Sequence, residues 1–450
     1  MATRRMQVAV DKRPTGSLAA DVIVVGGGAA GVAAAVTAAR RGLKVLVLER
    51  YGFCGGGAVA GLSGTICGLY AASERDDARP EKVVFGFVDE FIAAMESRGG
   101  LTGPVRYGRT FTRVHDPLVW RETADALLAE AGAGILFHAL VTGVLMDGGE
   151  RVEGVQVTTK EGRFDVRAGL VIDASGDADV VAMAGLDFTV GDDGNVQNPT
   201  MIFRMLGVDV GEFMRVHGPD TILGPDISAL MARLDGHGYK LPRKKVFLFP
   251  TPRPGELLCN ATRVVGSDGR ELNPLVARDF TEAEIEGRKQ VREYVRFFKQ
   301  HIAGCKDAFL NDTGVQVGVR ETRQVRGLAT LSNEDVVSAR KFATAIARSP
   351  WPIEMHTGDK PRLVWLYEDY YEVPYECFVP VRGEGLLTAG RCLSAQHEAM
   401  ASARVTAQCF SYGHAIGLAA ALCVQEGVAP RRLDGKALRE ELKRSGAALD

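Results

Sequence analysis

The sequence lacks the cysteine pairs that mark metal sites and redox-active disulfides. No two of its eight cysteines form a C-x-x-C pair or follow the spacing of metal ligands, and they stand at positions 54, 67, 259, 305, 377, 392, 409 and 423. Scattered cysteines of this kind are typical of reduced thiols in a cytosolic protein. We therefore expect no metal site, no disulfide exchange and a cytoplasmic location.

An excess of charge of either sign is also missing. The chain has 54 basic and 56 acidic residues and a formal net charge of -2, which gives no electrostatic reason to expect nucleic acid or a membrane surface as a partner. No apolar run reaches the roughly 18 residues that a membrane-spanning helix needs, so we expect a soluble chain. Arg4 and Arg5 are followed by Asp11 and Pro14 where a signal peptide would be apolar, and residues 1–18 are predicted to be a loosely held tail.

The chain is organised around a strand, a glycine turn and a helix near its start. Residues 22–25 form a continuous apolar run, as in an inner parallel strand that is covered on both faces. Gly26, Gly28 and Gly31 follow with the spacing G-x-G-x-x-G, and an alanine-rich segment runs to Arg41. The first glycine allows a tight turn, the second lets the backbone approach a pyrophosphate, and the third lets helix and strand pack closely.

The next strand supports a nucleotide site. The predicted strand at 44–48 is Lys44 followed by four apolar residues, and it leads to Glu49, placed where a carboxylate can accept hydrogen bonds from the ribose of an adenosine. Three glycines alone can be an ordinary tight connection, but the flanking strands, helix and acid favour an ADP-binding βαβ unit. The glycine cluster at 55–57 is expected to bring backbone close to the same ligand, and a flexible turn is the alternative.

Two later strands are expected to reach this ligand as well. Residues 169–172 and 385–387 are short apolar runs, and each leads into a turn of small residues. In an open α/β sheet the ligand lies beyond the carboxyl ends of the strands. A long helix from about Ser402, rich in small residues, is expected to pack closely on the sheet and to point the positive end of its dipole at an anion.

The segments between these strands follow other patterns. Asp116 and Pro117 predict a helix N-cap and first turn, and Val152, Val155 and Val157 alternate as in a strand of a meander. The middle of the chain has no dinucleotide signature and is expected to hold strands at 201–205 and 245–249. Thr281 and Glu284 predict a capping box before an amphipathic helix with the apolar stripe Ile285, Val291, Val295, Phe298 and Ile302.

Five features follow one another along the chain: the fingerprint with Glu49, the turn at 173–177, and the segments 318–323, 371–375 and 389–405. In these features the chain resembles the FAD-dependent oxidoreductases of the glutathione reductase 2 superfamily, relatives of fumarate reductase flavoproteins and HdrA-like proteins. The resemblance covers nearly the whole chain after residue 20. The absence of a second G-x-G-x-x-G and of C-x-x-C confines any likeness to disulfide reductases to the FAD fold.

The resemblance implies an α/β fold with a discontinuous FAD-binding, Rossmann-like domain of the glutathione reductase 2 type at residues 19–190 and 375–450. An inserted α+β substrate domain at residues 191–374 would close the pocket over the flavin. The residues expected to bind FAD are Gly26, Gly28, Ala29, Ala30, Gly31, Glu49, Arg50, Gly55, Gly56, Val141, Ala174, Ser175, Gly176, Asp177, Gly390, Arg391, Arg404 and Val405.

Hydride transfer at a flavin needs a substrate carbon over the ring, a group that takes or gives a proton, and charges that orient the substrate. Arg320, Arg323 and Arg404 are candidates for gripping a carboxylate, because a guanidinium offers a planar fork. Arg320 and Glu321 can instead form a structural ion pair. The full set of candidate catalytic residues is Arg320, Glu321, Arg323, His356, Tyr371, His397 and Arg404.

The remaining candidates have structural alternatives. His356 and His397 are expected in loops near the flavin as acid or base, although a lone histidine is often structural. Tyr371 and Tyr375 are expected on one strand face, where they present hydroxyls to the pocket or pack in the core.

The sequence thus predicts an FAD-dependent oxidoreductase that performs two-electron oxidation or reduction, by hydride transfer at flavin N5, of a small polar or anionic organic substrate. One alternative is a flavin-dependent, redox-neutral isomerase or hydratase. Another is an FAD-carrying electron-transfer subunit, which is disfavoured because such proteins usually accompany iron-sulfur ligands. The expected partners are a small-molecule substrate and an electron acceptor or donor of unidentified kind.

Overall fold

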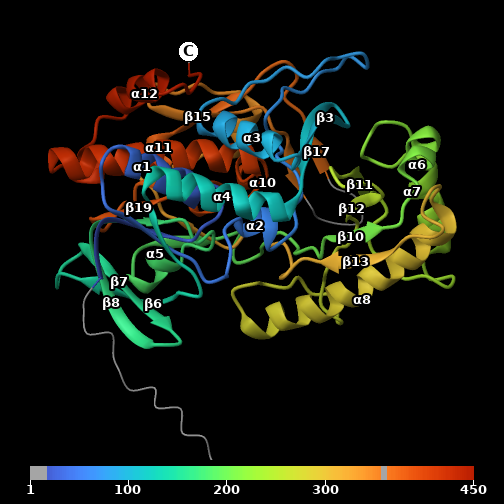
Figure 1. The fold of residues 1–450 in the computed structure, drawn as a ribbon, viewed down its shortest axis with the longest axis horizontal. Helices are drawn as coiled ribbons and strands as arrows, with labels where there is room; N and C mark the ends of the chain where they lie inside the picture. The colour runs from blue at the N-terminus through green and yellow to red at the C-terminus, as the bar shows by residue number, and fades with distance from the viewer. Residues whose placement is uncertain (1–17, 356–361, 450) are drawn as a thin grey trace, which may run out of the picture.

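A seven-stranded sheet lies toward one end of the molecule in the computed structural model, which describes residues 18–355 and 362–449 (Figure 1). Its strand order is β5-β2-β1-β8-β7-β6, with β19 also beside β8. The strands are β1 (Leu18–Val25), β2 (Val45–Leu48), β5 (Gly134–Leu136), β6 (Leu140–Met146), β7 (Val152–Thr159), β8 (Gly162–Asp173) and β19 (Leu386–Thr388). Strands β5, β2, β1, β8 and β19 run parallel, whereas β6, β7 and β8 form an antiparallel meander.

Strand β1 is longer than its apolar run predicts. It begins at Leu18, the last residue of the predicted tail, because Leu18, Ala19 and Ala20 pair with residues 166–168 of β8. The sequence did not show this extension, because Asp21 separates these three residues from the apolar run at 22–25. Residues 1–17 lie outside the described part of the chain.

The end of the chain returns to this sheet. Leu386, Leu387 and Thr388 of β19 pair with residues 171–173 of β8, next to the stretch of β8 that pairs with β1. The predicted long helix from Ser402 is two helices, α10 (His397–Ala403) and α11 (Thr406–Glu426), separated by Arg404 and Val405.

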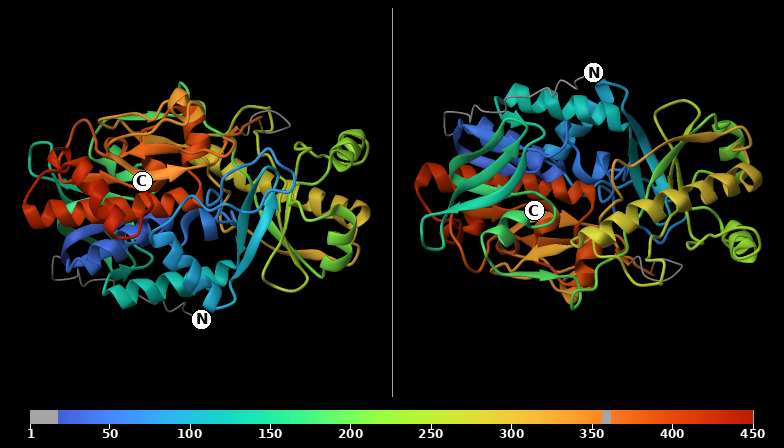
Figure 2. Two further views of the ribbon diagram at one scale, coloured as in Figure 1. Left: turned by 90° about the horizontal axis from the view of Figure 1, so that it is seen from above. Right: turned by 90° about the horizontal axis from the view of Figure 1, so that it is seen from below.

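The small residues of α11 make a close contact with another helix, and α11 also contacts β8 and β19 of the sheet, as expected. Helix α11 runs beside α1 (Ala29–Arg40), and the views in Figures 1 and 2 agree on this. A Cβ atom at Gly413 would lie 2.1 Å from the Ala30 carbonyl oxygen, and one at Gly417 would lie 2.4 Å from that of Ala34. The two ends of the sequence therefore meet along these two helices.

Helix α11 is long and apolar enough by composition to cross a membrane, and it is the one such helix in the described ranges. However, 83% of its apolar window is buried inside the protein. A helix that is apolar on all sides is expected in the core of a fold as well as in a bilayer. Its packing on α1 accounts for its composition.

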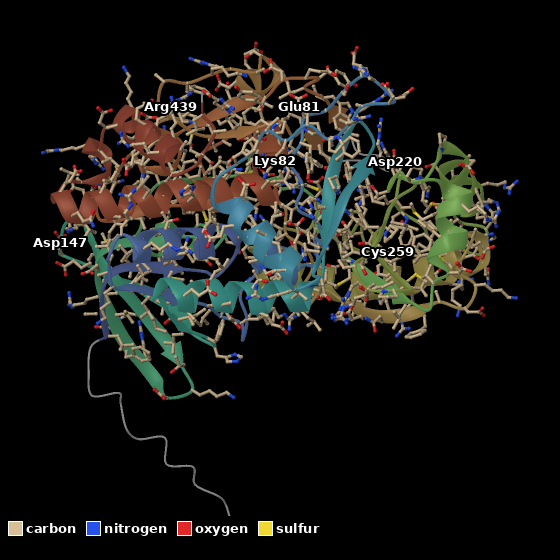
Figure 3. All side chains as sticks on the ribbon, turned by 45° about the horizontal axis from the view of Figure 1, so that its top comes forward. Glu81, Lys82, Asp147, Asp220, Cys259 and Arg439 are labelled. Atoms are coloured by element: carbon tan, nitrogen blue, oxygen red, sulfur yellow. The ribbon has the colours of Figure 1, made fainter. Side chains whose placement is uncertain are left out.

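A second core lies at the opposite end of the molecule, around a four-stranded sheet with the order β11-β12-β10-β13 (Figure 2). Cys259 is fully buried on β12 of this sheet (Figure 3). The sheet and the helix that packs with it consist of β10 (Phe203–Leu206), β11 (Phe247–Pro250), β12 (Glu256–Asn260), β13 (Phe309–Thr313) and α8 (Ala277–His301). Strands β10 and β11 each begin two residues later than predicted.

The predicted capping box at Thr281 and Glu284 is wrong, because it does not lie at the start of helix α8. Helix α8 begins at Ala277, so Thr281 lies inside the helix and its hydroxyl donates a hydrogen bond to the Ala277 carbonyl oxygen at 2.7 Å. Ile285 of the predicted apolar stripe is 45% exposed, whereas Val291, Val295 and Phe298 are buried. The stripe was therefore placed correctly from its second residue onward.

Residues 331–379 supply many side chains to the first core, together with α1 and α11. Here β15 (Ala345–Ser349) pairs with β18 (Tyr371–Pro374), and β16 (Ile353–Met355) pairs with β17 (Arg362–Val364). By packing, the second core spans residues 201–317 and does not extend to residue 374. The predicted division of the chain into domains stays a prediction.

The other elements cover these cores or connect them. Asp116 caps α4 by accepting a hydrogen bond from the backbone N–H of Leu118 at 2.8 Å, as the sequence predicts. The remaining helices and strands are α2 (Gly56–Val59), α3 (Phe87–Ser97), α4 (Pro117–Ala131), α5 (Asp179–Met183), α6 (Val210–His217), α7 (Pro225–Leu234), α9 (Asn333–Val337), α12 (Gly435–Arg444), β3 (Leu101–Tyr107), β4 (Thr110–His115), β9 (Phe188–Val190) and β14 (Arg323–Val325).

Candidate active site

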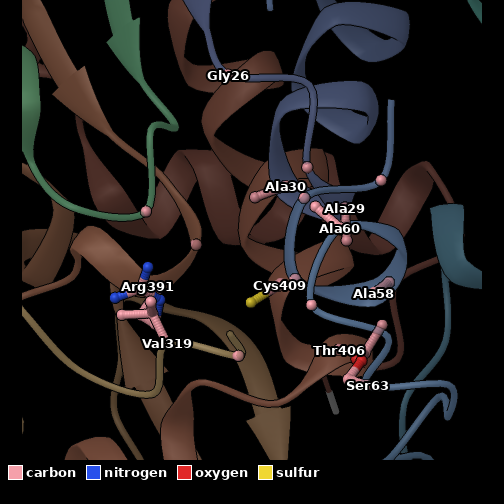
Figure 4. A pocket seen from close by; sticks show the side chains of 18 of the residues that line it. Gly26, Ala29, Ala30, Ala58, Ala60, Ser63, Val319, Arg391, Thr406 and Cys409 are labelled. Atoms are coloured by element: carbon pink, nitrogen blue, oxygen red, sulfur yellow. The ribbon is translucent and has the colours of Figure 1, made fainter. Parts of the chain in front are cut away.

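A cavity of about 310 Å³ lies at the carboxyl edge of the main sheet and reaches the second sheet. Its volume is in the range of small-molecule sites. The ends of β1, β2, β8 and β19 contribute Gly26, Glu49, Ser175 and Arg391, and β11 contributes Phe249. Figure 4 shows how segments far apart in the sequence meet around it.

The glycine turn after β1 is closely packed and opens on this cavity. Gly26 has φ +99°, a value that L side chains rarely adopt, and a Cβ atom at Gly31 would lie 1.9 Å from the Gly26 carbonyl oxygen. A Cβ atom at Gly56 would lie 3.0 Å from the Cα atom of Gly28. The two glycine clusters therefore lie against each other and present backbone to a ligand.

Helix α1 begins at this turn with its first backbone N–H groups uncapped. Its N-cap residue is Gly28, and no side chain among the described residues caps this end. Gly28, Ala29 and Ala30 line the cavity. Unpaired N–H groups and the positive end of the helix dipole favour an anionic ligand such as a pyrophosphate.

Glu49 holds the glycine turn in place from the end of β2. Its Oε2 atom accepts a hydrogen bond from the Gly27 N–H at 2.7 Å, and its Oε1 atom accepts one from the Tyr51 N–H at 2.9 Å. Burial raises the pKa of the Glu49 carboxyl, and these N–H donors oppose that rise. Glu49 also lines the cavity, so its predicted contact with a ribose remains compatible with its position.

The turn after β8 is fixed by its own carboxylate. Asp173 is fully buried and accepts hydrogen bonds from the Ser175 hydroxyl at 2.6 Å and from the Val180 N–H at 2.8 Å. Ala174, Ser175 and other residues of the turn thereby face the cavity. The sequence predicted this turn but not the role of Asp173 in shaping it.

The turns after β8 and β19 are joined by an ion pair. Nη2 of Arg391 donates to Oδ1 of Asp177 at 2.8 Å, and the Thr322 hydroxyl donates to the same oxygen at 2.7 Å. Burial alone would raise the pKa of the Asp177 carboxyl, but Arg391 and Thr322 lower it. Arg391 points into the cavity region in Figure 4.

The structure gathers the predicted FAD residues around one cavity. All of them line it except Gly31, which packs behind the turn against Gly26. Arg50 and Tyr51 contact Gln316, so the loop after β2 touches the segment after β13 at the edge of the cavity. The amino end of α11 adds Val405, Thr406 and Cys409 to the lining.

The predicted catalytic residues separate into two groups. Arg320 and Arg404 line the cavity. Glu321 does not pair with Arg320, because its Oε2 atom lies 2.7 Å from Nδ1 of His397, and this contact raises the pKa of His397. His397 is the first residue of α10 and not part of a loop as predicted, and His356 lies outside the described residues.

Arg323 and the two tyrosines have structural partners. Arg323 pairs with Asp179 and donates to the Asp177 carbonyl oxygen at 2.8 Å. The hydroxyl of Tyr371 lies 2.8 Å from Oγ of Ser402, and that of Tyr375 donates to the Pro430 carbonyl oxygen at 3.0 Å. Tyr375 begins a 3₁₀ turn after β18, so the expected shared strand face does not exist. None of the three lines the cavity.

Sequence reasoning missed the side chains at the far end of the cavity. Tyr107, Phe249, Trp351 and Glu354 line it, and the Tyr107 hydroxyl donates to Oε1 of Glu354 at 3.0 Å. They come from β3, β11, the segment before β16, and β16 itself. The tryptophan, one of three in the chain, with an acid three residues later, is the only local signal that we find.

Two thiols also line the cavity. Burial raises the pKa of Cys67 to about 11 and that of Cys409 to about 12. Because the thiolate is the reactive form, neither cysteine is an activated nucleophile at neutral pH.

The site fits FAD by its residue chemistry. Three features meet in the cavity: glycine backbone without side chains, the uncapped amino end of α1, and an acid at the end of β2, Glu49. These features suit an adenosine diphosphate. The cavity then continues past Gly390 toward Tyr107 and Trp351, which leaves space for the flat part of such a cofactor and a substrate.

Solved structures with the same fold include a flavin-dependent enzyme. A geranylgeranyl bacteriochlorophyll reductase-like protein from Thermoplasma acidophilum is 18% identical, with a TM-score of 0.51, over 95% of this chain and 83% of that chain. The flavin-dependent brominase Bmp2 is 15% identical, with a TM-score of 0.51, over 95% of this chain and 83% of that one. The p-nitrophenol 4-monooxygenase PnpA from Pseudomonas putida is 11% identical, with a TM-score of 0.50, over 96% of this chain and 88% of that one. At these identities the likeness shows the fold alone.

A search of curated protein sequences found no match. The family model for FAD dependent oxidoreductases matches residues 21–442, from β1 to the last helix. This range includes every described residue that we assign to the cavity. The chain therefore belongs to the FAD dependent oxidoreductase family, and FAD is its cofactor.

Proposed function

We propose that this FAD-dependent enzyme carries out a two-electron, hydride-type oxidation or reduction of a small polar or anionic organic substrate. The observation that carries this proposal is the continuity of one cavity from the glycine turn at Gly26 to the polar group formed by Arg320, Arg404, Tyr107 and Glu354. Bound FAD would supply the two-electron chemistry, and the protein would supply orientation and protons.

The residues at the far end of the cavity suit those two tasks. Arg320 and Arg404 can orient a substrate through their guanidinium groups. Burial raises the pKa of Tyr107 well above its ordinary value, so its hydroxyl stays protonated at neutral pH and donates to Glu354. A hydroxyl held in this way can relay a proton from a substrate to Glu354, because it can take the substrate's proton while it gives its own to the carboxylate.

We also infer that the chain is a member of the glutathione reductase 2 superfamily, with residues 191–374 acting as its substrate domain. The return of β19 to the sheet beside β8 supports a nucleotide domain built from both ends of the chain. The second sheet contributes Phe249 and Asn260 to the cavity, which supports a role in choosing the substrate. A cytoplasmic enzyme with a small-molecule substrate agrees with the near balance of charge.

Anaerobic reduction and reoxidation test the redox proposal. The purified protein is expected to carry FAD, and illumination should bleach its flavin absorbance. A screen of small organic acids, alcohols and unsaturated compounds should then find a compound that restores or bleaches the band in proportion to the amount added. A protein without flavin contradicts the proposal. So does turnover of a compound with no change in its oxidation state, which would identify a redox-neutral enzyme.

A further inference from the structure

Three arginines surround the far end of the cavity, around Tyr107 and Glu354. Arg320 and Arg404 line the cavity, and Arg243 lies just behind its wall, where its Nη1 donates to Oδ1 of the lining residue Asn260 at 2.9 Å. Arg243 and Arg320 are buried, with 3% and 7% of their surface exposed, and Arg404 is partly buried.

The hydrogen-bond acceptors of these arginines are neutral oxygens. Arg320 donates to the Asn198 carbonyl oxygen, Arg404 donates to Oε1 of Gln197 at 3.2 Å, and Arg243 donates to Asn260 and to the Lys245 carbonyl oxygen at 2.8 Å. Over residues 18–355 and 362–449, no carboxylate makes a salt bridge with any of the three. By contrast, carboxylates pair with other cavity-side and core arginines, as in Arg391–Asp177, Arg323–Asp179 and Arg204–Asp312.

The positive charge at this end is only partly balanced. Glu354 influences all three arginines and already accepts the Tyr107 hydrogen bond, and Glu321 is a second acid that influences Arg404. Burial, followed by repulsion from Arg404 and Arg243, lowers the pKa of Arg320 well below its ordinary value. Buried charges without counterions are costly, so a bound anion would stabilise this group.

Two further donors at this end have no acceptor among residues 18–355 and 362–449. Nε of Arg404 and Nε1 of Trp351 are both buried, and neither has a hydrogen-bond partner in the described part of the chain. Both residues line the cavity. Buried donors are normally satisfied, so these two suggest that a ligand with acceptor oxygens belongs here.

The wall beside these donors is aromatic. Tyr107, Phe249 and Trp351 line the cavity and belong to one hydrophobic cluster, separate from the cores of the two sheets. The Tyr107 ring centroid lies 5.2 Å from that of Trp351 and 6.1 Å from that of Phe249. Aromatic surfaces of this kind favour a planar, unsaturated ligand over a hydrated sugar or a polyol.

We propose that the far end of the cavity is a binding site for a planar organic carboxylate, an aromatic or conjugated acid. Arg320 and Arg404 hold its carboxylate, and Tyr107, Phe249 and Trp351 contact its body. This inference rests on the proposed function, because it names the substrate class of the same site. Arg243 supports the site from behind Asn260 and adds positive charge.

The test is calorimetric binding of matched small probes to the purified, FAD-loaded protein. Benzoate and cinnamate carry the carboxylate on a planar body, benzamide removes the charge, and cyclohexanecarboxylate removes the planarity. We expect benzoate or cinnamate to bind at least about tenfold more tightly than benzamide and more tightly than cyclohexanecarboxylate, since a charge-assisted hydrogen bond is typically worth this factor or more.

Variants identify the groups that bind the carboxylate. Arg320→Met and Arg404→Met should each weaken benzoate binding at least about tenfold, and Arg404→Lys should recover part of the loss, because it restores the charge without the planar fork. Arg215→Met, on the exposed face of α6, is the matched control and should bind as the unaltered protein does. Thermal unfolding of each variant checks that it is folded.

The outcomes separate this inference from the proposed function. Absence of benzoate and cinnamate binding, equal affinity for benzoate and benzamide, or equal affinity for cyclohexanecarboxylate overturns the carboxylate site while leaving a flavin redox enzyme possible. Variants that lose FAD but keep the affinity for benzoate also overturn it, because the arginines would then serve the cofactor. A preparation without FAD contradicts the proposed function, whereas calorimetry still reads carboxylate binding directly.

Discussion

Gly413 of α11 lies against the backbone of Ala30 in α1, so closely that a Cβ atom at Gly413 would stand 2.1 Å from the Ala30 carbonyl oxygen. Ala30 and its neighbours line the cavity from the first part of the chain, and Thr406 and Cys409 line it from the start of α11. This contact therefore sets the position of both helix ends that face the cofactor.

Gly413→Ala should lower both stability and FAD affinity. The added methyl group has no room beside the Ala30 carbonyl, and overpacking of this kind typically costs about 1 to 3 kcal/mol of unfolding free energy. Urea unfolding and the FAD content of the purified variant measure the two effects. Gly211→Ala, at an exposed position of α6, is the control and should change stability only slightly. Unaltered stability and FAD content in Gly413→Ala would show that α1 and α11 can separate without consequence.

The parts of the fold near this contact were predictable because their signals are local. The apolar strand, the glycine spacing and the alanine-rich helix are read from residues 22–41, and the pairing of β1 with β2 and β8 agrees with that reading. The position of Gly413 against Ala30 is different, since it depends on two segments that lie far apart in the sequence. A stripe of small residues indicates close packing but does not name the partner.

The cofactor side of the site was more predictable than the substrate side. Residues such as Gly28, Glu49 and Asp177 stand at the carboxyl ends of strands, where parallel sheets bind ligands. No such rule applies to Tyr107, Trp351 and Glu354, because β3 and the segment at residues 351–354 lie far apart in the sequence and meet only in the folded chain. The pairing of Arg323 was not predictable either, since its partner Asp179 lies on α5 and no spacing predicts the pair.

Asp177→Asn should loosen the two turns that close the cavity. The change removes the charge that Arg391 faces while keeping the size of the side chain, and both side chains are mostly buried. The loss of one charge-assisted hydrogen bond predicts a decrease of about 2 kcal/mol in unfolding free energy, together with weaker FAD retention. Asp187→Asn is the matched control, because Asp187 is partly exposed and forms an ion pair with Arg382. Normal stability with full FAD occupancy would mean that the pair does not hold the turns.

Stability should depend on the ionisation of His397. Its contact with the buried Glu321 raises the pKa of the imidazole above the ordinary 6.5 in the folded protein. Protonation of His397 therefore stabilises the folded state. This stabilisation is complete below about pH 6.5, the pKa of histidine in the unfolded chain, and it is lost as the pH rises through the higher pKa of His397 in the folded protein. Urea unfolding at a series of pH values measures this decline. His397→Gln should remove this decline in stability. If the variant keeps the same pH dependence, the decline comes from another group.

Tyr107→Phe separates proton transfer from binding at the proposed active site. The substitution keeps the aromatic ring that contacts Trp351 and removes the hydroxyl that donates to Glu354 at 3.0 Å. If this hydroxyl moves a proton in the reaction, the rate of substrate-dependent flavin reduction or reoxidation should fall by about a hundredfold or more, while probe binding changes little. Rapid-mixing absorbance measurements of the flavin band provide the rate, and calorimetry with benzoate provides the affinity. Tyr239→Phe, in the second core and outside the cavity lining, is the control. A full rate in Tyr107→Phe would place the proton on another group and leave Tyr107 as part of the aromatic wall alone.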